Sequence, residues 1–267
     1  MRAVFLDFGT VSSGDLDTGS LERVTPGIVL HQQTSAADVA GRIAGFDAVF
    51  ANKAVINRAM IEANPQLRLI ALTATGTDNV DIVAAREAAV AVCNLREYCT
   101  PSVVQHVFAM LLALTHRLRD YDALVHDGRW EQAGQFSVFP YPMRELQGRA
   151  FGIVGFGALG RAVARVAESF GMQVEIANRA GGPAVAGRRD LDEMLPQLDV
   201  LSLHCPLTEA TRGLIGSARL ARMKPDAVLI NTARGALVDT KALAEALRNQ
   251  RLGGAGIDVF EREPPPS

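Results

Sequence analysis

The chain has 267 residues, of which 48% are hydrophobic, so it is long enough for about two domains and too apolar for a disordered protein. Its 27 basic and 29 acidic residues give a formal net charge of −2, which does not favour nucleic-acid binding or attachment to an anionic membrane surface. Because 24 of the 27 basic residues are Arg, a single Arg is a weak indication of function.

The three cysteines, Cys93, Cys99 and Cys205, predict reduced thiols rather than disulfides or a metal site. Their number is odd, and none has a metal-ligand spacing to another Cys or His. The first apolar run ends at Asp7 after four residues, and no run approaches the roughly 18 residues that span a bilayer. We therefore expect no signal peptide, no membrane span, no metal and a cytoplasmic location.

The first third of the chain alternates short apolar runs with amphipathic stretches. We predict strands at 3–6, 28–31, 48–51, 69–72 and 91–93. Helices are expected at 36–44, 57–63 and 82–88, the first of them starting from a capping-box-like Ser35. Such alternation is typical of a parallel sheet with helices on both faces.

A single long helix is predicted over residues 101–127. Thr100 suits its N-cap, Pro101 its first turn and Gly128 its end. Apolar residues cover more than one of its faces, which indicates packing against more than one partner. We interpret it as the link between two domains and as a candidate subunit contact.

A second alternation follows. Strands are expected at 150–154, 173–177, 200–203, 227–231 and 254–258, and helices at 158–170, 190–195, 217–223 and 240–249. The sequence thus predicts two α/β domains.

Gly155, Gly157 and Gly160 form a G-x-G-x-x-G turn between a predicted strand and a predicted helix. In a dinucleotide-binding turn the first glycine makes the sharp bend, the second lets the pyrophosphate approach, and the third lets the helix pack against the strand. The helix N-terminus then offers unpaired N–H groups to the phosphates. The alternative is a glycine turn that binds no ligand.

The end of the next strand predicts which dinucleotide binds. Asn178 follows Gly155 at nearly the spacing of the acidic residue that binds the adenosine ribose. A neutral Asn178 does not repel a 2′-phosphate, and Arg179 can pair with one, with Arg188 and Arg189 nearby. We expect NADP(H) to be favoured over NAD(H); alternatively Asn178 binds a plain ribose and Arg179 is solvated.

Several motifs, in order and spacing, resemble the D-isomer-specific 2-hydroxyacid dehydrogenases. They are Ala74-Thr-Gly76-Thr-Asp-Asn-Val-Asp81, the turn 155–160, His204-Cys-Pro-Leu207 with Thr211, Met223-Lys-Pro-Asp-Ala, Asn231-Thr-Ala-Arg234-Gly235 and Gly256-Ile-Asp258-Val-Phe-Glu-Arg-Glu263-Pro. Asn52-Lys53 and the segment 98–106 look most like glycerate dehydrogenases, also called hydroxypyruvate reductases. The resemblance covers nearly the whole chain.

The resemblance implies two doubly wound parallel-sheet domains. Residues 1–99 would form a flavodoxin-like substrate domain, and residues 100–267 a Rossmann NAD(P)-binding domain that includes the linking helix. The implied activity is hydride transfer between NAD(P)H and a small 2-oxo acid, hydroxypyruvate or glyoxylate, giving D-glycerate or glycolate. D-lactate or formate are alternative family substrates, and a homodimer is the implied assembly.

The catalytic residues that the resemblance implies are Arg234 and Glu263. Arg234 follows a predicted strand at its carboxyl end, where its planar fork suits a carboxylate and the adjacent carbonyl oxygen. Glu263 matches the glutamate that orients the general-acid histidine and raises its pKa. The substrate-binding residues implied are Lys53, Thr75, Gly76, Thr77 and Arg234, with a solvated Lys53 as the alternative.

The cofactor-binding residues that the resemblance and the turn imply run from the linking helix to the last strand. They are Thr100, Val104, Gly155, Gly157, Ala158, Leu159, Gly160, Asn178, Arg179, His204, Cys205, Pro206, Thr211, Thr232, Ala233, Arg234 and Asp258. His204 is thus expected beside the cofactor rather than as the acid catalyst.

One family feature is missing from these 267 residues. The family's general-acid histidine and its C-terminal return segment lie downstream of Glu263, and none of His31, His106, His116, His126 or His204 occupies that position. We expect a dehydrogenase whose C-terminal segment is not part of this sequence. The alternative is a redox-inactive dinucleotide-binding sensor or interaction protein.

Overall fold

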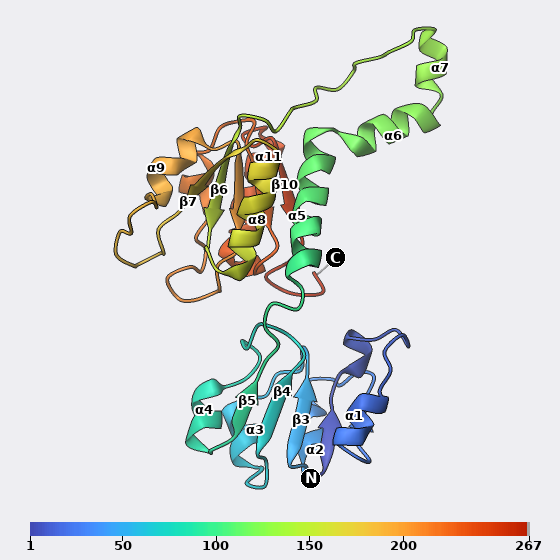
Figure 1. Cartoon of the computed structure of the whole chain (residues 1–267), viewed down its shortest axis with the longest axis vertical. Helices are drawn as coiled ribbons and strands as arrows, with labels where there is room; N and C mark the ends of the chain where they lie inside the picture. The colour runs from blue at the N-terminus through green and yellow to red at the C-terminus, as the bar shows by residue number, and fades with distance from the viewer. Residues whose placement is uncertain (266–267) are drawn as a thin grey trace. The chain divides into compact units, whose positions relative to one another are not determined.

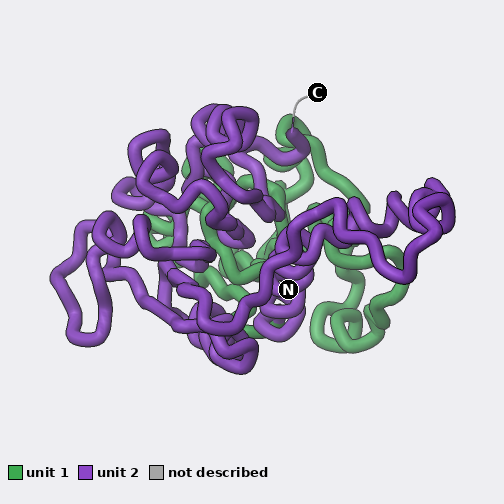
Figure 2. Tube along the Cα trace, turned by 90° about the horizontal axis from the view of Figure 1, so that it is seen from above, with its two compact units in different colours: residues 1–98 green, residues 99–267 purple. Residues whose placement is uncertain are grey.

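The computed structural model describes residues 1–265 and divides into two compact units, residues 1–98 and 99–267 (Figure 2). The division falls one residue before the boundary expected from the sequence. Each unit is built on one five-stranded parallel sheet, so the predicted fold class is confirmed.

Unit 1 has the strand order β2-β1-β3-β4-β5 (Figure 1). Its strands are β1 (Ala3–Phe5), β2 (Val29–Leu30), β3 (Ala48–Ala51), β4 (Leu69–Leu72) and β5 (Ala91–Cys93). Its helices are η1 (Phe8–Thr10), α1 (Gly19–Val24), α2 (Val39–Ile43), α3 (Arg58–Glu62) and α4 (Ile82–Glu87). This is the flavodoxin-like order, in which the chain changes direction across the sheet between β1 and β3.

Side-chain caps fix two of these helices. Asn57 accepts a hydrogen bond from Met60 N at 3.1 Å and begins α3, and Asp81 accepts one from Ala84 N at 2.8 Å and begins α4. The expected cap Ser35 is wrong, because its hydroxyl donates to Asp38 Oδ2 at 2.7 Å in a turn and α2 starts only at Val39.

Unit 2 has the order β10-β9-β8-β6-β7, with the change of direction between β6 and β8. Its strands are β6 (Ala150–Val154), β7 (Gln173–Ile176), β8 (Val200–Leu203), β9 (Val228–Asn231) and β10 (Gly254–Ile257). Its helices are α5 (Thr100–Thr115), α6 (Leu118–His126), α7 (Arg129–Ala133), α8 (Ala158–Ser169), α9 (Leu191–Met194), η2 (Leu195–Gln197), α10 (Ser217–Leu220), η3 (Gly235–Leu237) and α11 (Thr240–Arg248).

The sheet of unit 2 has a core on each face, because alternate residues of its strands point to opposite sides. Leu201, Leu203 and Leu229 pack with α9, α10 and α11, whereas Val200 and Val228 pack with α5 and α8. Figure 1 shows α5 and α8 side by side over one face. Burial on both faces explains the near-continuous apolar strands of the sequence.

The single helix predicted over 101–127 is wrong, since the chain forms two helices that meet at Arg117. Arg117 has a φ of +53°, which no helix interior allows, and its Nε donates to Asp120 Oδ2 at 2.5 Å in the first turn of α6. At the other end Cys99, not Thr100, is the N-cap of α5. Gly128 follows α6 with a left-handed φ, as expected.

The segment from α6 to Met143 forms an arm with little core of its own; we call it the arm (residues 118–143) and Figure 1 shows it leaving the sheet. The part of the arm that follows α7 is held to α6 by Tyr121 Oη, which donates to Tyr141 O at 2.9 Å. Phe136 and Phe139 are 96% and 78% exposed. No helix among residues 1–265 is both long and apolar enough to cross a bilayer, and no cluster of His, Cys, Asp and Glu there could hold a metal.

Candidate active site

The glycine turn joins β6 to α8 at the carboxyl edge of the unit 2 sheet. Gly155 has a φ of +96°, and a Cβ on it would lie 2.5 Å from Cys205 N. A Cβ on Gly160 would lie 2.1 Å from Gly155 O. A Cβ on Gly157 would meet nothing within 4 Å, so this position has open space beside it. The three positions thus have the geometry of a tight bend, a ligand approach and a helix–strand contact.

Helix α8 begins at this turn without a side-chain cap. Gly157 is its N-cap residue, and Ala158, Leu159 and Gly160 form its first turn. The N–H groups of a first helical turn have no partner within the helix, and they carry the positive end of its dipole. The turn lies where the chain changes direction between β6 and β8, which is where open α/β sheets bind their ligands.

Two buried polar atoms at the same edge lack a hydrogen-bond partner among residues 1–265. They are Nδ1 of His204, directly after β8, and Oγ1 of Thr232, directly after β9. Buried polar atoms are rarely left unpaired in native proteins, so each is a candidate contact for a bound polar ligand. Together with the open side of Gly157 and the uncapped start of α8, they fit a dinucleotide.

His204 is held neutral. Burial lowers the pKa of His204 to about 4, and its Nε2 lies 2.9 Å from Ser202 Oγ. A neutral imidazole with a pKa this low has no proton to give at pH 7. This agrees with the expectation that His204 does not act as the acid catalyst. Burial likewise raises the pKa of the Cys205 thiol to about 11, so Cys205 is not a reactive thiolate.

The loop after β7 surrounds Asn178. Its Oδ1 accepts a hydrogen bond from Val185 N at 3.0 Å, and its own N–H donates to Arg189 O at 2.7 Å. Arg179 is exposed, whereas Arg189 Nη1 donates to Glu175 Oε2 at 2.5 Å. Arg189 is therefore neutralised by a carboxylate, which the sequence did not indicate.

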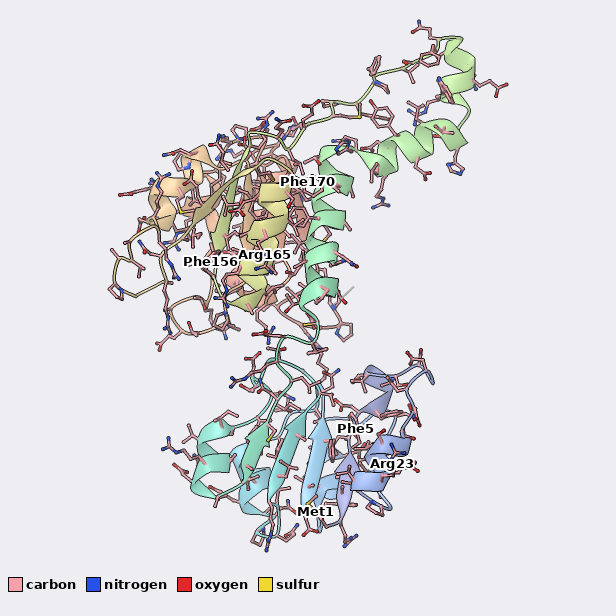
Figure 3. All side chains as sticks on the ribbon, viewed as in Figure 1. Met1, Phe5, Arg23, Phe156, Arg165 and Phe170 are labelled. Carbon is pink, nitrogen blue, oxygen red and sulfur yellow. The ribbon has the colours of Figure 1, made fainter. Side chains whose placement is uncertain are left out.

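Arg188 lies over the aromatic ring of Phe156, inside the glycine turn. Its guanidinium carbon is 6.0 Å from the ring centroid, at the outer limit of a cation–π contact. Figure 3 labels Phe156 near the start of α8 and Phe170 near its end. The contact brings the Arg188 end of the 178–189 loop close to the glycine turn.

Arg234 lies in a turn at the carboxyl end of β9, and Asn231 shapes that turn. The buried Asn231 donates from Nδ2 to Arg234 O at 2.9 Å and accepts at Oδ1 from Ala233 N at 3.1 Å. A Cβ on Gly235 would lie 1.9 Å from Phe260 C, so only glycine lets the segment after β10 lie against this turn.

Asp258 and Glu263 both lie in that segment after β10. Asp258 Oδ1 is 3.1 Å from His106 Nε2 of α5, and both side chains are about half exposed. Glu263 Oε1 accepts a hydrogen bond from Phe260 N at 3.0 Å. The segment therefore presents two carboxylates beside the Arg234 turn.

Two other residues expected near the cofactor have structural roles here. Val104 is buried in the core between α5 and α8. Thr211 is buried, and its hydroxyl donates to Pro206 O at 2.8 Å and accepts from Thr208 N at 2.7 Å, which fixes the loop after β8. Pro206 itself is exposed.

The expected substrate-binding residues of unit 1 follow two adjacent strands. Lys53 is exposed in the turn after β3, and Thr75, Gly76 and Thr77 follow β4. Asn79 joins the two turns, because its Nδ2 donates to Ala54 O at 2.9 Å. Unit 1 thus brings a cation and a glycine-containing turn to one edge of its sheet.

The sequence pattern indicates no role for Asn231, His106 or Asp7, whose side chains contact the candidate site residues or their turns. Asn231 begins the motif Asn231-Thr-Ala-Arg234-Gly235, in which Arg234 is the residue with an implied role. His106 is one of several polar residues on a helix, and nothing in its spacing predicts a partner 152 residues away. In the sequence Asp7 is simply the residue that ends an apolar run.

The protein-family profile described as "D-isomer specific 2-hydroxyacid dehydrogenase, NAD binding domain" matches residues 108–267. The chain is 35% identical over 271 residues to the hydroxypyruvate reductase of Blautia hydrogenotrophica, covering 99% of the chain and 84% of that protein. It is 40% identical over 228 residues to the glycerate dehydrogenase of Methylorubrum extorquens, covering 85% and 72%. The D-lactate dehydrogenase of Aquifex aeolicus, solved with NAD and lactic acid, superposes with a TM-score of 0.85 at 27% identity, covering 98% and 78%.

Fold, glycine turn and comparisons together define the class: an NAD(P)-dependent oxidoreductase with a dinucleotide-binding α/β domain. Within that class, the chain belongs to the D-isomer-specific 2-hydroxyacid dehydrogenases. The reaction of this family is hydride transfer between a nicotinamide dinucleotide and a 2-oxo or 2-hydroxy acid. The family resemblance drawn from the motifs is confirmed.

Proposed function

We propose that this protein reduces hydroxypyruvate or glyoxylate with NADPH, giving D-glycerate or glycolate. The observation that carries the proposal is the Arg234 turn, fixed by Asn231 at the carboxyl end of β9 and two strands from the glycine turn. Relatives named hydroxypyruvate reductase, glycerate dehydrogenase and glyoxylate reductase support a small 2-oxo acid as the substrate.

In this proposal Arg234 binds the substrate through two of its N–H groups, one to the carboxylate and one to the carbonyl oxygen. The same contact to the carbonyl oxygen stabilises the negative charge that grows there during reduction. The bound nicotinamide supplies the hydride. Lys53 and the turn 75–77 bind the substrate carboxylate, with Lys53 adding charge and the turn adding N–H donors.

In this proposal Glu263 orients the proton donor, which is the family's general-acid histidine downstream of Glu263. A carboxylate beside an imidazole fixes its tautomer and stabilises its protonated form. Within the described residues, Glu263 is exposed and its Oε1 accepts a backbone hydrogen bond, which holds the carboxylate beside the Arg234 turn. We assign it as a positioning carboxylate.

A preference for NADP(H) over NAD(H) is the second part of the proposal. Asn178 provides a neutral side chain where a carboxylate would repel a 2′-phosphate, and Arg179 is exposed next to it. Arg188 reaches Phe156 and adds positive charge, while Arg189 is already paired with Glu175. Arg179 and Arg188 are therefore the cations that we assign to the phosphate.

We also propose a homodimeric, cytoplasmic enzyme. The exposed aromatic side chains of the arm supply an apolar surface that a second copy would cover. Cys93 is exposed, Cys99 is partly buried and Cys205 is buried, and all three are free thiols. Free thiols suit a reducing compartment.

The proposal is tested by steady-state kinetics of the full-length protein with NADPH and four acids: hydroxypyruvate, glyoxylate, pyruvate and a 2-oxo acid with a bulky apolar side chain. We expect kcat/KM to be highest for hydroxypyruvate or glyoxylate and the reduced product of hydroxypyruvate to be the D-isomer. A kcat/KM for pyruvate at least about tenfold above both would instead identify a D-lactate dehydrogenase.

A further inference from the structure

Asp7 is the buried carboxylate of unit 1. It is 4% exposed and stands directly after the apolar run of β1. Its Oδ1 accepts from Asn52 N at 2.8 Å, and its Oδ2 accepts from Lys53 N at 2.6 Å and from Ala54 N at 2.8 Å. Three successive N–H groups of the turn after β3 thus converge on one carboxylate. Hydrogen bonds to a charged acceptor are among the strongest in proteins, so this contact fixes the turn.

The position of Asp7 is informative because it lies at the point where the unit 1 sheet reverses its direction, between β1 and β3. In unit 2 the turn after the first strand is the glycine turn, where a Cβ on Gly157 would meet nothing within 4 Å and an anionic ligand has room. In unit 1 the chain's own carboxylate occupies the place of such an anion and uses the N–H groups of the next turn. The N–H groups of that turn are therefore used within unit 1, and the turn presents the exposed Lys53 to solvent.

The turn is held from its other side as well. Asn52 Nδ2 donates to Thr10 Oγ1 at 2.9 Å, and Thr10 Oγ1 in turn donates to Asp7 O at 2.7 Å. On the side of β4, Asn79 Nδ2 donates to Ala54 O at 2.9 Å, and Ile56 N donates to Asn79 O at 2.8 Å. The backbone of Lys53 is thus immobilised while its ammonium group stays in solvent.

We propose that Asp7 is a positioning residue for substrate binding: its carboxylate fixes the turn Asn52–Ala54 and thereby holds Lys53 where it binds the carboxylate of the 2-oxo acid. Asp7 does not touch the substrate. The inference rests on the proposed function, since it concerns the substrate carboxylate. It predicts that loss of the Asp7 carboxylate weakens substrate binding and leaves cofactor binding in unit 2 unchanged.

The direct test is Asp7→Asn in the full-length protein. The variant keeps the size of the side chain but puts an NH2 group against N–H donors, so at least one of the three hydrogen bonds is lost. We expect the KM for hydroxypyruvate or glyoxylate to rise about tenfold, with kcat and the KM for NADPH unchanged within about twofold. Amide hydrogen exchange in the peptide that contains residues 52–54 should accelerate about tenfold or more.

The matched control is Asp47→Asn. Asp47 Oδ2 accepts from Arg2 N at 2.6 Å, a carboxylate–backbone contact of the same kind at the opposite edge of the same sheet. The Asp47→Asn variant should leave the KM for the 2-oxo acid unchanged. Asn79→Ala, which removes the other support of the turn, should raise the same KM by a smaller factor and keeps the inference testable if Asp7→Asn does not fold.

A double-mutant cycle with Lys53→Met separates positioning from a general loss of order. If Asp7 acts through Lys53, the combined variant should have nearly the KM of Lys53→Met alone rather than the product of the two effects. An active wild type whose Asp7→Asn variant keeps its KM for the acid would overturn the inference, as would an equal effect of Asp47→Asn. A wild type that reduces no 2-oxo acid would overturn the proposed function, and this inference with it.

Discussion

At the scale of single residues, Asn178 is the residue that we propose selects the cofactor. Asn178→Asp keeps the oxygen that accepts from Val185 N, so the loop should remain as it is. The new carboxylate repels a 2′-phosphate and accepts from a ribose 2′-hydroxyl. We expect the ratio of kcat/KM for NADPH to that for NADH to fall about tenfold or more.

Two arginines of the same loop give the matching pair of variants. Arg179→Gln should lower the NADPH to NADH ratio because Arg179 is assigned to the phosphate. Arg189→Gln should leave it unchanged because that guanidinium is already paired with Glu175. An unchanged ratio in Asn178→Asp, or equal effects of the two arginine variants, would mean that this loop does not select the cofactor.

We expect His204 to make the stability of unit 2 depend on pH. Its pKa of about 4 lies below the 6.5 of an unfolded chain, so the unfolded state binds the proton more tightly. The stability that the neutral imidazole confers is therefore present above about pH 7 and is lost as the pH falls toward 4. Between pH 7 and 5 the loss amounts to about 2 kcal/mol.

The loss of stability between pH 7 and pH 5 is measured by urea unfolding of the wild type and of His204→Asn at both pH values. The variant cannot bind the proton, so its free energy of unfolding should change less over that interval than the wild type's. Equal changes in the free energy of unfolding of the two proteins would show that a group other than His204 binds the proton.

At the scale of elements, variants of the glycine turn between β6 and α8 distinguish the effect of packing from the effect of ligand binding. Gly157→Ala places a methyl group in open space at a backbone conformation that alanine adopts, so stability should change by less than about 0.5 kcal/mol. The methyl group obstructs the phosphates, and the Kd for NADPH should rise about tenfold.

Gly160→Ala is the contrasting change. Its methyl group would overlap Gly155 O, which should cost about 2 kcal/mol of stability as well as cofactor affinity. Fluorescence titration with NADPH and urea unfolding distinguish the two variants. If Gly157→Ala binds NADPH as tightly as the wild type, the phosphates do not approach at this position.

The strands and the glycine turn were predictable from sequence because their signals are local. Four or five apolar residues between turn signals, and three glycines at fixed spacing, determine their own conformation. The break at Arg117 was not predictable, because a left-handed Arg is uncommon and is stabilised here by Asp120 and by the Tyr141 ring 5.7 Å away. The support of Lys53 by Asp7 and of Asp258 by His106 joins residues far apart in sequence, which local pattern does not reveal.

At the scale of the whole molecule, the exposed phenylalanines of the arm indicate a surface through which two copies of the protein associate. We expect the wild type to sediment as a dimer, and the double variant Phe136→Asp, Phe139→Asp as a monomer, because buried carboxylates would oppose association. Val24→Asp is the control, since Val24 is as exposed as Phe139 but lies in α1 of unit 1. A monomeric wild type, or a dimer that survives the double variant, would refute the assignment.

We propose that Arg234 binds and activates a 2-oxo acid beside a bound NADPH, and a comparison of kinetics with cofactor affinity in one variant tests this role. NADPH oxidation by hydroxypyruvate should proceed in the wild type, and Arg234→Gln should lower kcat/KM about a thousandfold, or about 4 kcal/mol, while the Kd for NADPH changes less than about threefold. An Arg234→Gln variant that keeps the wild-type kcat/KM, or a wild type that binds NADPH but oxidises it with no 2-oxo acid, would contradict this role of Arg234.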